Sequence, residues 1–109
     1  MILRHIVMWK FKEGPDKEEN IETFRKGLLS LTDCVPGILS MQFGKQMKEN
    51  DRNCDAVLLM DFADETALQN YLQHPEHKKV SAFCKSIRES RHAVDFWVEE
   101  RIAGNIDTM

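Results

Sequence analysis

The chain has 109 residues, of which 42% are apolar and 30% carry charge, and these values are ordinary for a single compact domain. Fifteen basic and eighteen acidic side chains give a net charge of −3, and the basic residues are scattered along the sequence. A protein that binds nucleic acid typically gathers its positive charge in a patch or stripe. The composition therefore excludes nucleic acid as an expected partner.

The first segment, MILRHIVMWKF, is apolar but contains three basic or titratable side chains and no small-residue cleavage site. It is also too short to cross a bilayer, so we expect a structural element and no membrane segment. Cys34, Cys54 and Cys84 are odd in number and widely spaced, without a C-x-x-C pair. This usage predicts reduced thiols in a cytoplasmic protein. We expect no metal centre and no cofactor.

The first half of the chain predicts three strands and a helix. Residues 2–11 are rich in β-branched and aromatic side chains, which favours a strand. After a GPD turn, Asp16 can cap a helix and Glu19 completes a capping box. The sequence VPG ends this helix; alternating residues then predict a strand over 38–46, and the apolar run CDAVLLMDF predicts another over 54–62. The helix places four apolar residues at helical spacing, namely Ile21, Phe24, Leu28 and Leu31.

The second half predicts a broken helix and a last strand. Asp64 can cap a short helix, which ends at His74 because a residue before proline is pushed out of the α region. Pro75 can begin the next helix. Residues 91–99, RHAVDFWVE, have the composition of a strand.

The resulting order is βαββαβ, an α+β arrangement of the ferredoxin-like type, with a four-stranded antiparallel sheet and its helices on one face. Both faces of the first and fourth strands are apolar, so the face without helices would be an exposed apolar patch in a monomer. Two copies facing each other would bury that patch in a symmetric homodimer. The residues expected at this dimer interface are Ile6, Met8, Val94, Phe96 and Val98.

Four stretches carry a resemblance to a known family: RHIVMWKFKEG, VPGILSMQFGK, LQNYLQHPEHKKV and HAVDFWV. Over residues 2–99 the chain resembles the stress-responsive A/B barrel (Dabb) domains, and residues 100–109 are left as a C-terminal tail. The resemblance implies a ferredoxin-like fold and a homodimer that forms a dimeric α/β barrel. Most members have no assigned activity, some are stress-related plant proteins, and one is a plant polyketide cyclase that closes a ring by aldol condensation.

The resemblance to that cyclase also implies a set of catalytic residues. A tyrosine and a histidine of the cyclase are replaced here by Gly27 and Ala56, so we do not expect the same substrate. The cyclase residues that this chain does match are four: the pocket histidine at His5, the tyrosine at Tyr71, the catalytic histidine at His77 and the aspartate that orients it at Asp95.

Elementary chemistry gives His77 a defined environment. It would lie in the first turn of a helix, whose dipole disfavours the imidazolium, whereas Asp95 could accept its other N–H and favour the charged form. A neutral imidazole with a fixed tautomer suits a base that removes a proton next to a carbonyl, and Tyr71 could donate to the enolate. The alternative is structural: a His77–Asp95 bond would only tie the broken helix to the sheet, and His5 and Tyr71 would be core residues.

A cavity between helices and sheet would need apolar walls. The residues expected to bind a substrate there are Trp9, Phe24, Leu28 and Phe83, which the same pattern also allows as plain core. His74 is expected to be a cap or surface residue. A metal shared by His74 and His77 would lack further ligands at suitable spacing.

Three functions remain open, and the sequence does not decide whether the protein is an enzyme. The first is a small-molecule enzyme, a cyclase, lyase or isomerase that abstracts a proton next to a carbonyl. The second is a non-catalytic, stress-related dimer that binds a hydrophobic or aromatic ligand or a partner. The third is a small cofactor-free monooxygenase, which would not need the HP-x-H motif and the aspartate.

Overall fold

A computed structural model describes residues 1–99, and the predicted tail, 100–109, lies outside the described residues. The predicted βαββαβ order is confirmed, with the second helix broken in two. The elements are β1 (Leu3–Phe11), α1 (Lys17–Cys34), β2 (Ile38–Lys45), β3 (Ala56–Phe62), α2 (Glu65–Gln73), α3 (Pro75–Ile87) and β4 (Arg88–Trp97).

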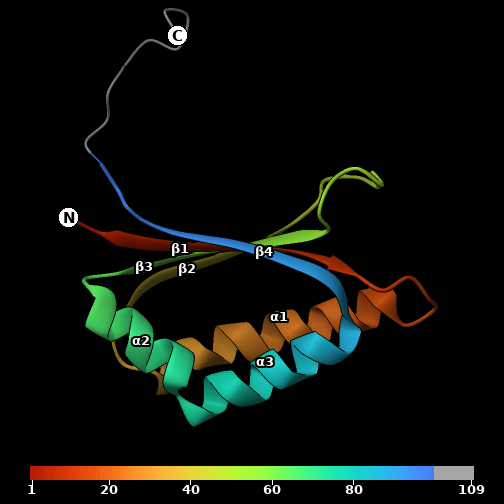
Figure 1. Ribbon diagram of the computed structural model, residues 1–109. Helices are drawn as coiled ribbons and strands as arrows, with labels where there is room; N and C mark the ends of the chain where they lie inside the picture. The colour runs from red at the N-terminus through yellow and green to blue at the C-terminus, as the bar shows by residue number, and fades with distance from the viewer. Residues whose placement is uncertain (100–109) are drawn as a thin grey trace, which may run out of the picture.

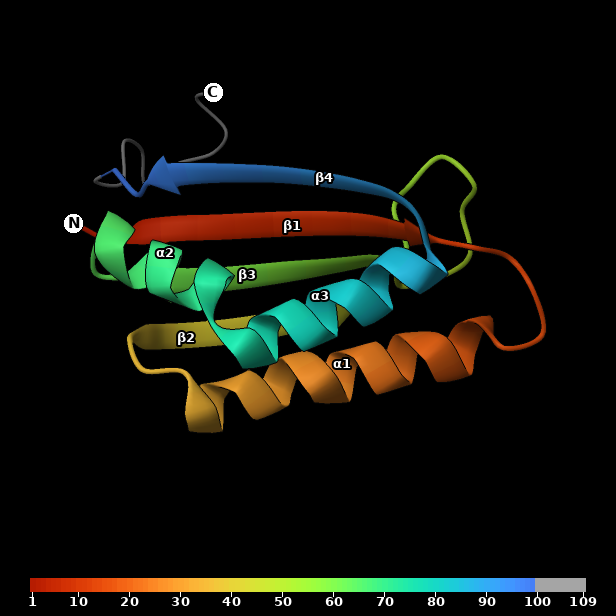
Figure 2. The ribbon, with the colours of Figure 1, turned by 60° about the horizontal axis from the view of Figure 1, so that its bottom comes forward.

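The strands form an antiparallel sheet in the order β2-β3-β1-β4, and the helices all lie against one of its faces (Figures 1 and 2). This is a ferredoxin-like α+β fold. In the β1–β4 register, His5 pairs with Asp95 and Trp9 pairs with Arg91. Side chains on paired positions of one strand pair point to the same face. These four residues therefore share the face that carries the helices.

The break at residues 73–77, QHPEH, is a pair of helix caps. The backbone of His74 is extended, so α2 stops there, and Pro75 occupies the first turn of α3. The His74 Nδ1 atom accepts a hydrogen bond from the Glu76 N–H at 3.1 Å, which confirms the expected capping role. At the other end of α2, the Asp64 carboxylate accepts from the Ala67 N–H at 2.9 Å.

Two local predictions were wrong. Asp16 precedes α1, but its side chain makes no capping hydrogen bond, so the capping box with Glu19 does not form. The last strand begins at Arg88, three positions before the predicted start. The reason is that α3 passes into β4 without a loop, and the polar residues after Ile87 read in sequence as helix surface.

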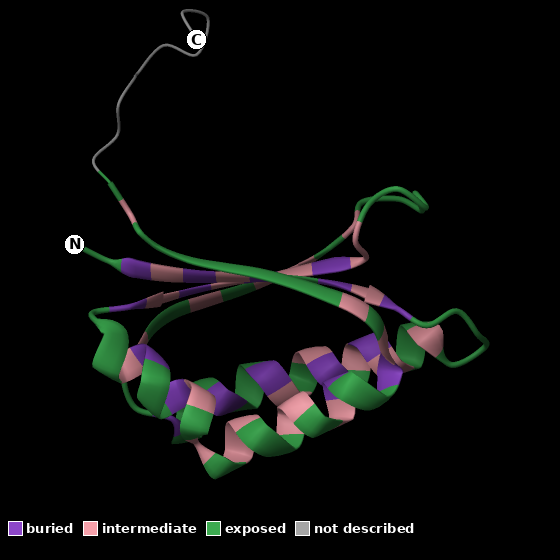
Figure 3. Cartoon of the chain, viewed as in Figure 1, coloured by how far each residue is buried: buried purple, intermediate pink, exposed green. Residues whose placement is uncertain are grey.

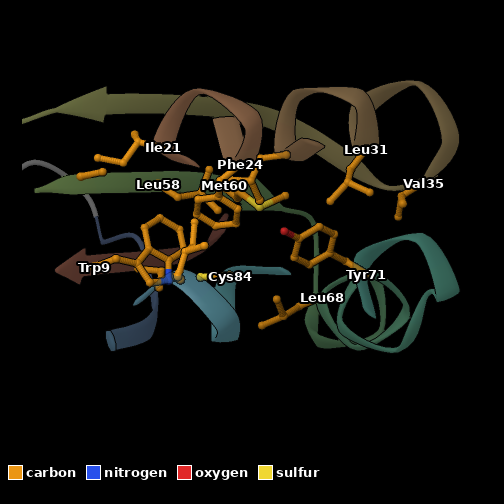
Figure 4. Packing of buried hydrophobic residues seen from close by; sticks show 14 of the residues in the cluster. Trp9, Ile21, Phe24, Leu31, Val35, Leu58, Met60, Leu68, Tyr71 and Cys84 are labelled. Carbon is orange, nitrogen blue, oxygen red and sulfur yellow. The ribbon is translucent and has the colours of Figure 1, made fainter. Parts of the chain in front are cut away.

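The core lies between the sheet and the helices (Figures 3 and 4). Alternate residues of β1 and β3 are buried in it, whereas β4 is exposed along most of its length because no helix covers that edge. Within residues 1–99 no helix has the length and hydropathy needed to cross a membrane.

Candidate functional site

A cavity of about 210 Å³ lies between the helix face of the sheet and helices α1–α3. A buried water needs only about 10–15 Å³ and typical ligand pockets hold about 300–1,000 Å³, so the space suits a small organic molecule. Its lining combines apolar and polar side chains. The lining residues are His5, Val7, Trp9, Phe24, Leu28, Leu58, Tyr71, His77, Val80, Ser81, Cys84, Lys85, Arg88 and Arg91.

His5 is the one polar or charged residue among residues 1–99 that is fully buried, with 4% of its surface exposed. Its Nδ1 atom lies 2.5 Å from a carboxylate oxygen of Asp95, its cross-strand partner. A carboxylate accepts and does not donate, so the proton of this bond is on Nδ1 of the imidazole. In the neutral tautomer the Nε2 atom therefore has a free lone pair.

His77 is half-buried in the first turn of α3. Its Nδ1 atom lies 3.1 Å from the carbonyl oxygen of Leu72, in the last turn of α2. A carbonyl can only accept, so Nδ1 donates and Nε2 again has a free lone pair. The same bond satisfies a helix-end carbonyl, which gives His77 a structural role as well.

The predicted hydrogen bond between His77 and Asp95 therefore does not form, and that prediction was wrong. Asp95 stands directly opposite His5 in the β1–β4 register, and its carboxylate accepts a hydrogen bond from the His5 imidazole. His77 is instead oriented by the backbone of the preceding helix. Two imidazoles thus face one cavity, each held by its Nδ1 atom through a different partner.

The ring of Tyr71 is close to both histidines. Its ring centroid is 4.5 Å from that of His77 and 6.3 Å from that of His5. Its side chain extends from α2 into the cluster, with the oxygen directed toward Met60 (Figure 4). Within residues 1–99 the hydroxyl makes no hydrogen bond to another side chain or to the backbone. Burial raises the pKa of Tyr71, so the phenol stays protonated and remains a donor.

The charge state of His77 is set mainly by burial, which lowers its pKa from the usual 6.5. The hydrogen bond to the Leu72 carbonyl opposes this by raising the pKa of His77, and nearby positive charge, on Arg91 among others, lowers it again, so that the net direction is downward. At neutral pH the imidazole is therefore uncharged, and its Nε2 atom can accept a proton.

The residues predicted to bind a substrate divide into two groups. Trp9, Phe24 and Leu28 line the cavity, and Trp9 and Phe24 meet edge to face at 4.8 Å. Phe83 does not line it and instead packs, half-buried, against the core. The periodicity that places Phe83 on the apolar face of α3 does not distinguish the core from the cavity wall.

The two positions at which this chain differs from the cyclase do not line the cavity. Ala56 is buried at the start of β3. A Cβ atom on Gly27 would lie 3.4 Å from a methyl of Val80, which does line the cavity. A side chain at this position of α1 would therefore contact α3 beside the cavity.

The basic side chains at the cavity are Lys85, Arg88 and Arg91. In the sequence they belong to the basic stretch HKK…KSIRESR, which favours a solvated helix surface and leaves an anion-binding rim as the alternative. Arg91 has the same strand parity as Asp95 and therefore shares its face of the sheet.

The opposite face of the sheet carries the predicted dimer residues. Met8, Val94 and Phe96 expose 40%, 52% and 37% of their surface, and Ile6 is half-buried between them. Next to this apolar group, Arg4 and Asp61 form a bidentate ion pair at 2.8 and 3.1 Å.

Together these features define a ferredoxin-like domain with a histidine-lined cavity between sheet and helices. Residues 3–98 match the stress responsive A/B barrel domain. The chain belongs to this family. No curated protein matches the sequence.

Several solved structures share the fold. A dimeric ferredoxin-like protein of unknown function from Thermobifida fusca is 25% identical, with a TM-score of 0.77 over 90% of this chain and 92% of that one. A dimeric protein of unknown function and ferredoxin-like fold from Bacteroides fragilis is 23% identical, with a TM-score of 0.80 over 87% and 94% of the two chains. A hydroxynitrile lyase from Passiflora edulis is 14% identical, with a TM-score of 0.81 over 94% and 97%.

Proposed function

We propose that the protein is a homodimeric small-molecule enzyme that abstracts a proton next to a carbonyl group. The observation that carries this proposal is the convergence of His5, Tyr71 and His77 on one cavity, with the Nε2 atoms of both histidines available. Reactions of this class include cyclisation, isomerisation and carbon–carbon cleavage, which share an enolate intermediate.

The three residues suit different steps. His77, neutral at pH 7, takes the proton from carbon through Nε2. Tyr71, held protonated by burial, donates to the oxygen on which negative charge develops. His5 donates to the same oxygen when its own Nε2 is protonated, and Asp95 then balances its charge.

The test is exchange of the α-protons of phenylacetone in D₂O, followed by proton NMR. This neutral ketone presents an acidic C–H and a ring that matches the aromatic wall. We expect the protein to exchange these protons faster than the buffer alone does. His77→Asn should remove most of this rate increase. If the wild-type chain gives only the background rate with phenylacetone, with related aryl ketones and with aryl keto acids, the enzyme proposal is wrong.

A second candidate is a non-catalytic dimer that binds an apolar ligand. It is favoured by the His77–Leu72 bond, which gives the histidine a purely structural reason to be present. Under this alternative a ligand would protect the protein against unfolding, and no ketone would exchange.

The homodimer part of the proposal is supported by the exposed apolar face and by the relative from T. fusca, which is dimeric at 25% identity. The Arg4–Asp61 pair lies on the same face, and Ser40 donates to Asp61 at 3.2 Å. Because these polar groups satisfy one another, covering them costs less than covering single charges.

A further inference from the structure

The cavity has a basic part that proton abstraction alone does not require. Lys85, Arg88 and Arg91, here called the basic rim, come from the end of α3 and from β4. Trp9, Phe24 and Leu28 give the same cavity an apolar lining, and Arg91 stands next to Trp9 in the β1–β4 register. The cavity therefore offers contacts for an apolar group and for an anion.

The basic rim brings three cationic side chains to one cavity, although acidic residues outnumber basic ones in this chain, eighteen to fifteen. Of the fourteen lysines and arginines in residues 1–99, five form an ion pair with an acidic side chain, namely Arg4, Lys17, Arg25, Lys45 and Lys79. Within residues 1–99 none of the three rim residues forms an ion pair.

Two of the three cations have a local explanation. Lys85 lies in the last turn of α3 and Arg88 follows its last residue, where positive charge is stabilised by the helix dipole. Arg91 lies beyond the helix, on β4 opposite Trp9, and has no such role. Its charge acts on the cavity, because it lowers the pKa of His77 in addition to the larger effect of burial.

Two acidic residues of β4 lie near the rim. Within residues 1–99, Glu89, which directly follows Arg88, forms no ion pair with a rim residue, and Asp95 is bound to His5. Asp95 is four residues from Arg91 on the same face of β4, a separation of roughly 13 Å along the strand. Arg91 lines the cavity, so a ligand inside it can contact the guanidinium.

We propose that the ligand of this cavity is a small organic carboxylate with an apolar or aromatic body. Arg91 binds the carboxylate, and the body lies against Trp9, Phe24 and Leu28. A guanidinium matches a carboxylate with two parallel N–H···O bonds, which a lysine does not reproduce. The inference rests on the proposed function and narrows its substrates to carbonyl compounds that also carry an acid group.

The test compares 3-phenylpropanoate with 3-phenylpropanamide, which has the same shape without the charge, by isothermal titration calorimetry on the full chain. We expect the acid to bind about tenfold or more tightly than the amide, the preference expected of a charge-assisted hydrogen bond. Arg91→Gln should remove the preference and leave the affinity for the amide. The control is Lys26→Gln on the outer side of α1, which also removes one positive charge. This variant should still bind the acid more tightly than the amide.

Equal affinity for acid and amide, failure of the acid to bind, or a preference that survives Arg91→Gln would each overturn the inference. Ketone exchange separates this result from the proposed function. If the protein exchanges the α-protons of phenylacetone but binds the acid no more tightly than the amide, the enzyme proposal stands and this inference is wrong. Acid preference that depends on Arg91, in a chain that exchanges neither neutral aryl ketones nor aryl keto acids, supports the binding site and removes the enzyme.

Discussion

His5 on β1 and Asp95 on β4 are joined across the strand pair by a 2.5 Å hydrogen bond, although 45% of the aspartate side chain is exposed and 4% of the histidine is. The pair links the buried cavity to the uncovered edge of the sheet. It also fixes which imidazole nitrogen faces the cavity, because the carboxylate accepts the Nδ1 proton.

Replacing this carboxylate by an amide tests the role of the pair. In Asp95→Asn the bond becomes neutral, and the difference between charged and neutral hydrogen bonds corresponds to about tenfold in rate. We expect α-proton exchange to fall by about that factor, with the fold and the dimer kept. Asp33→Asn on α1 removes the same charge far from the cavity and should leave the rate unchanged. Equal rates in both variants and the wild type would show that Asp95 has no part in the chemistry.

Tyr71 offers a change that keeps its volume. Its hydroxyl makes no hydrogen bond within residues 1–99, so Tyr71→Phe should leave the free energy of unfolding close to that of the wild type. If the phenol donates to the enolate oxygen, exchange should fall by about 10- to 100-fold. Urea unfolding and the exchange rate, measured on the same sample, separate the two effects. A large loss of stability with unchanged exchange would assign Tyr71 to the core alone.

Two substitutions at His77 separate its structural role from its chemical one. His77→Asn retains an N–H group that can donate to the Leu72 carbonyl but lacks the Nε2 lone pair, whereas His77→Ala lacks both. We expect exchange to fall by about 10²- to 10⁴-fold in both variants. Only His77→Ala should also lose about 0.5–1.5 kcal/mol of stability, because the carbonyl loses its partner. Normal exchange in His77→Asn would remove His77 as the base.

The lowered pKa of His77 gives stability a defined dependence on pH. Burial holds its folded pKa below the unfolded value of 6.5, so between these values the unfolded chain binds more protons. The stability contribution is therefore fully present above pH 6.5 and is lost as the pH falls through the folded pKa. Urea unfolding at pH 7.5 and 5 should show a smaller loss in His77→Asn than in the wild type. Exchange by the wild type should also decline on the acid side, with its midpoint below 6.5.

Some features were predictable from the sequence because they depend on local chemistry. Alternation along β1 placed His5 and Trp9 on one face, and Pro75 marked the break between α2 and α3. The partner of Asp95 was not predictable in this way. It depends on the register of two strands that are far apart in the chain, and a shift of that register by two residues would move Asp95 away from His5 without changing any pattern.

The site residues show the same division. His5, Tyr71 and His77 were found through a motif, and the structure brings them together at one cavity. The sequence placed Arg91 in a basic stretch with an anion-binding rim as one alternative, but its position at the cavity depends on the pairing of β1 with β4 and is visible only in three dimensions. Phe83 was predicted to line the cavity but packs against the core, because the apolar face of a helix can pack against either.

The exposed sheet face predicts a dimer that a single charge should disrupt. Phe96 exposes 37% of its surface in the isolated chain, and burying such apolar area contributes roughly 25 cal/mol per Å² before the entropy of association is subtracted. Phe96→Glu would bring two unpaired charges to the joint of a symmetric interface. Leu29 on α1 exposes 36%, so Leu29→Glu is a control with almost the same exposure on the helix side. By light scattering at micromolar concentration we expect two chains per particle for the wild type and Leu29→Glu, and one for Phe96→Glu. A monomeric wild type, or a dimer that withstands Phe96→Glu but not Leu29→Glu, would place the interface elsewhere or remove it.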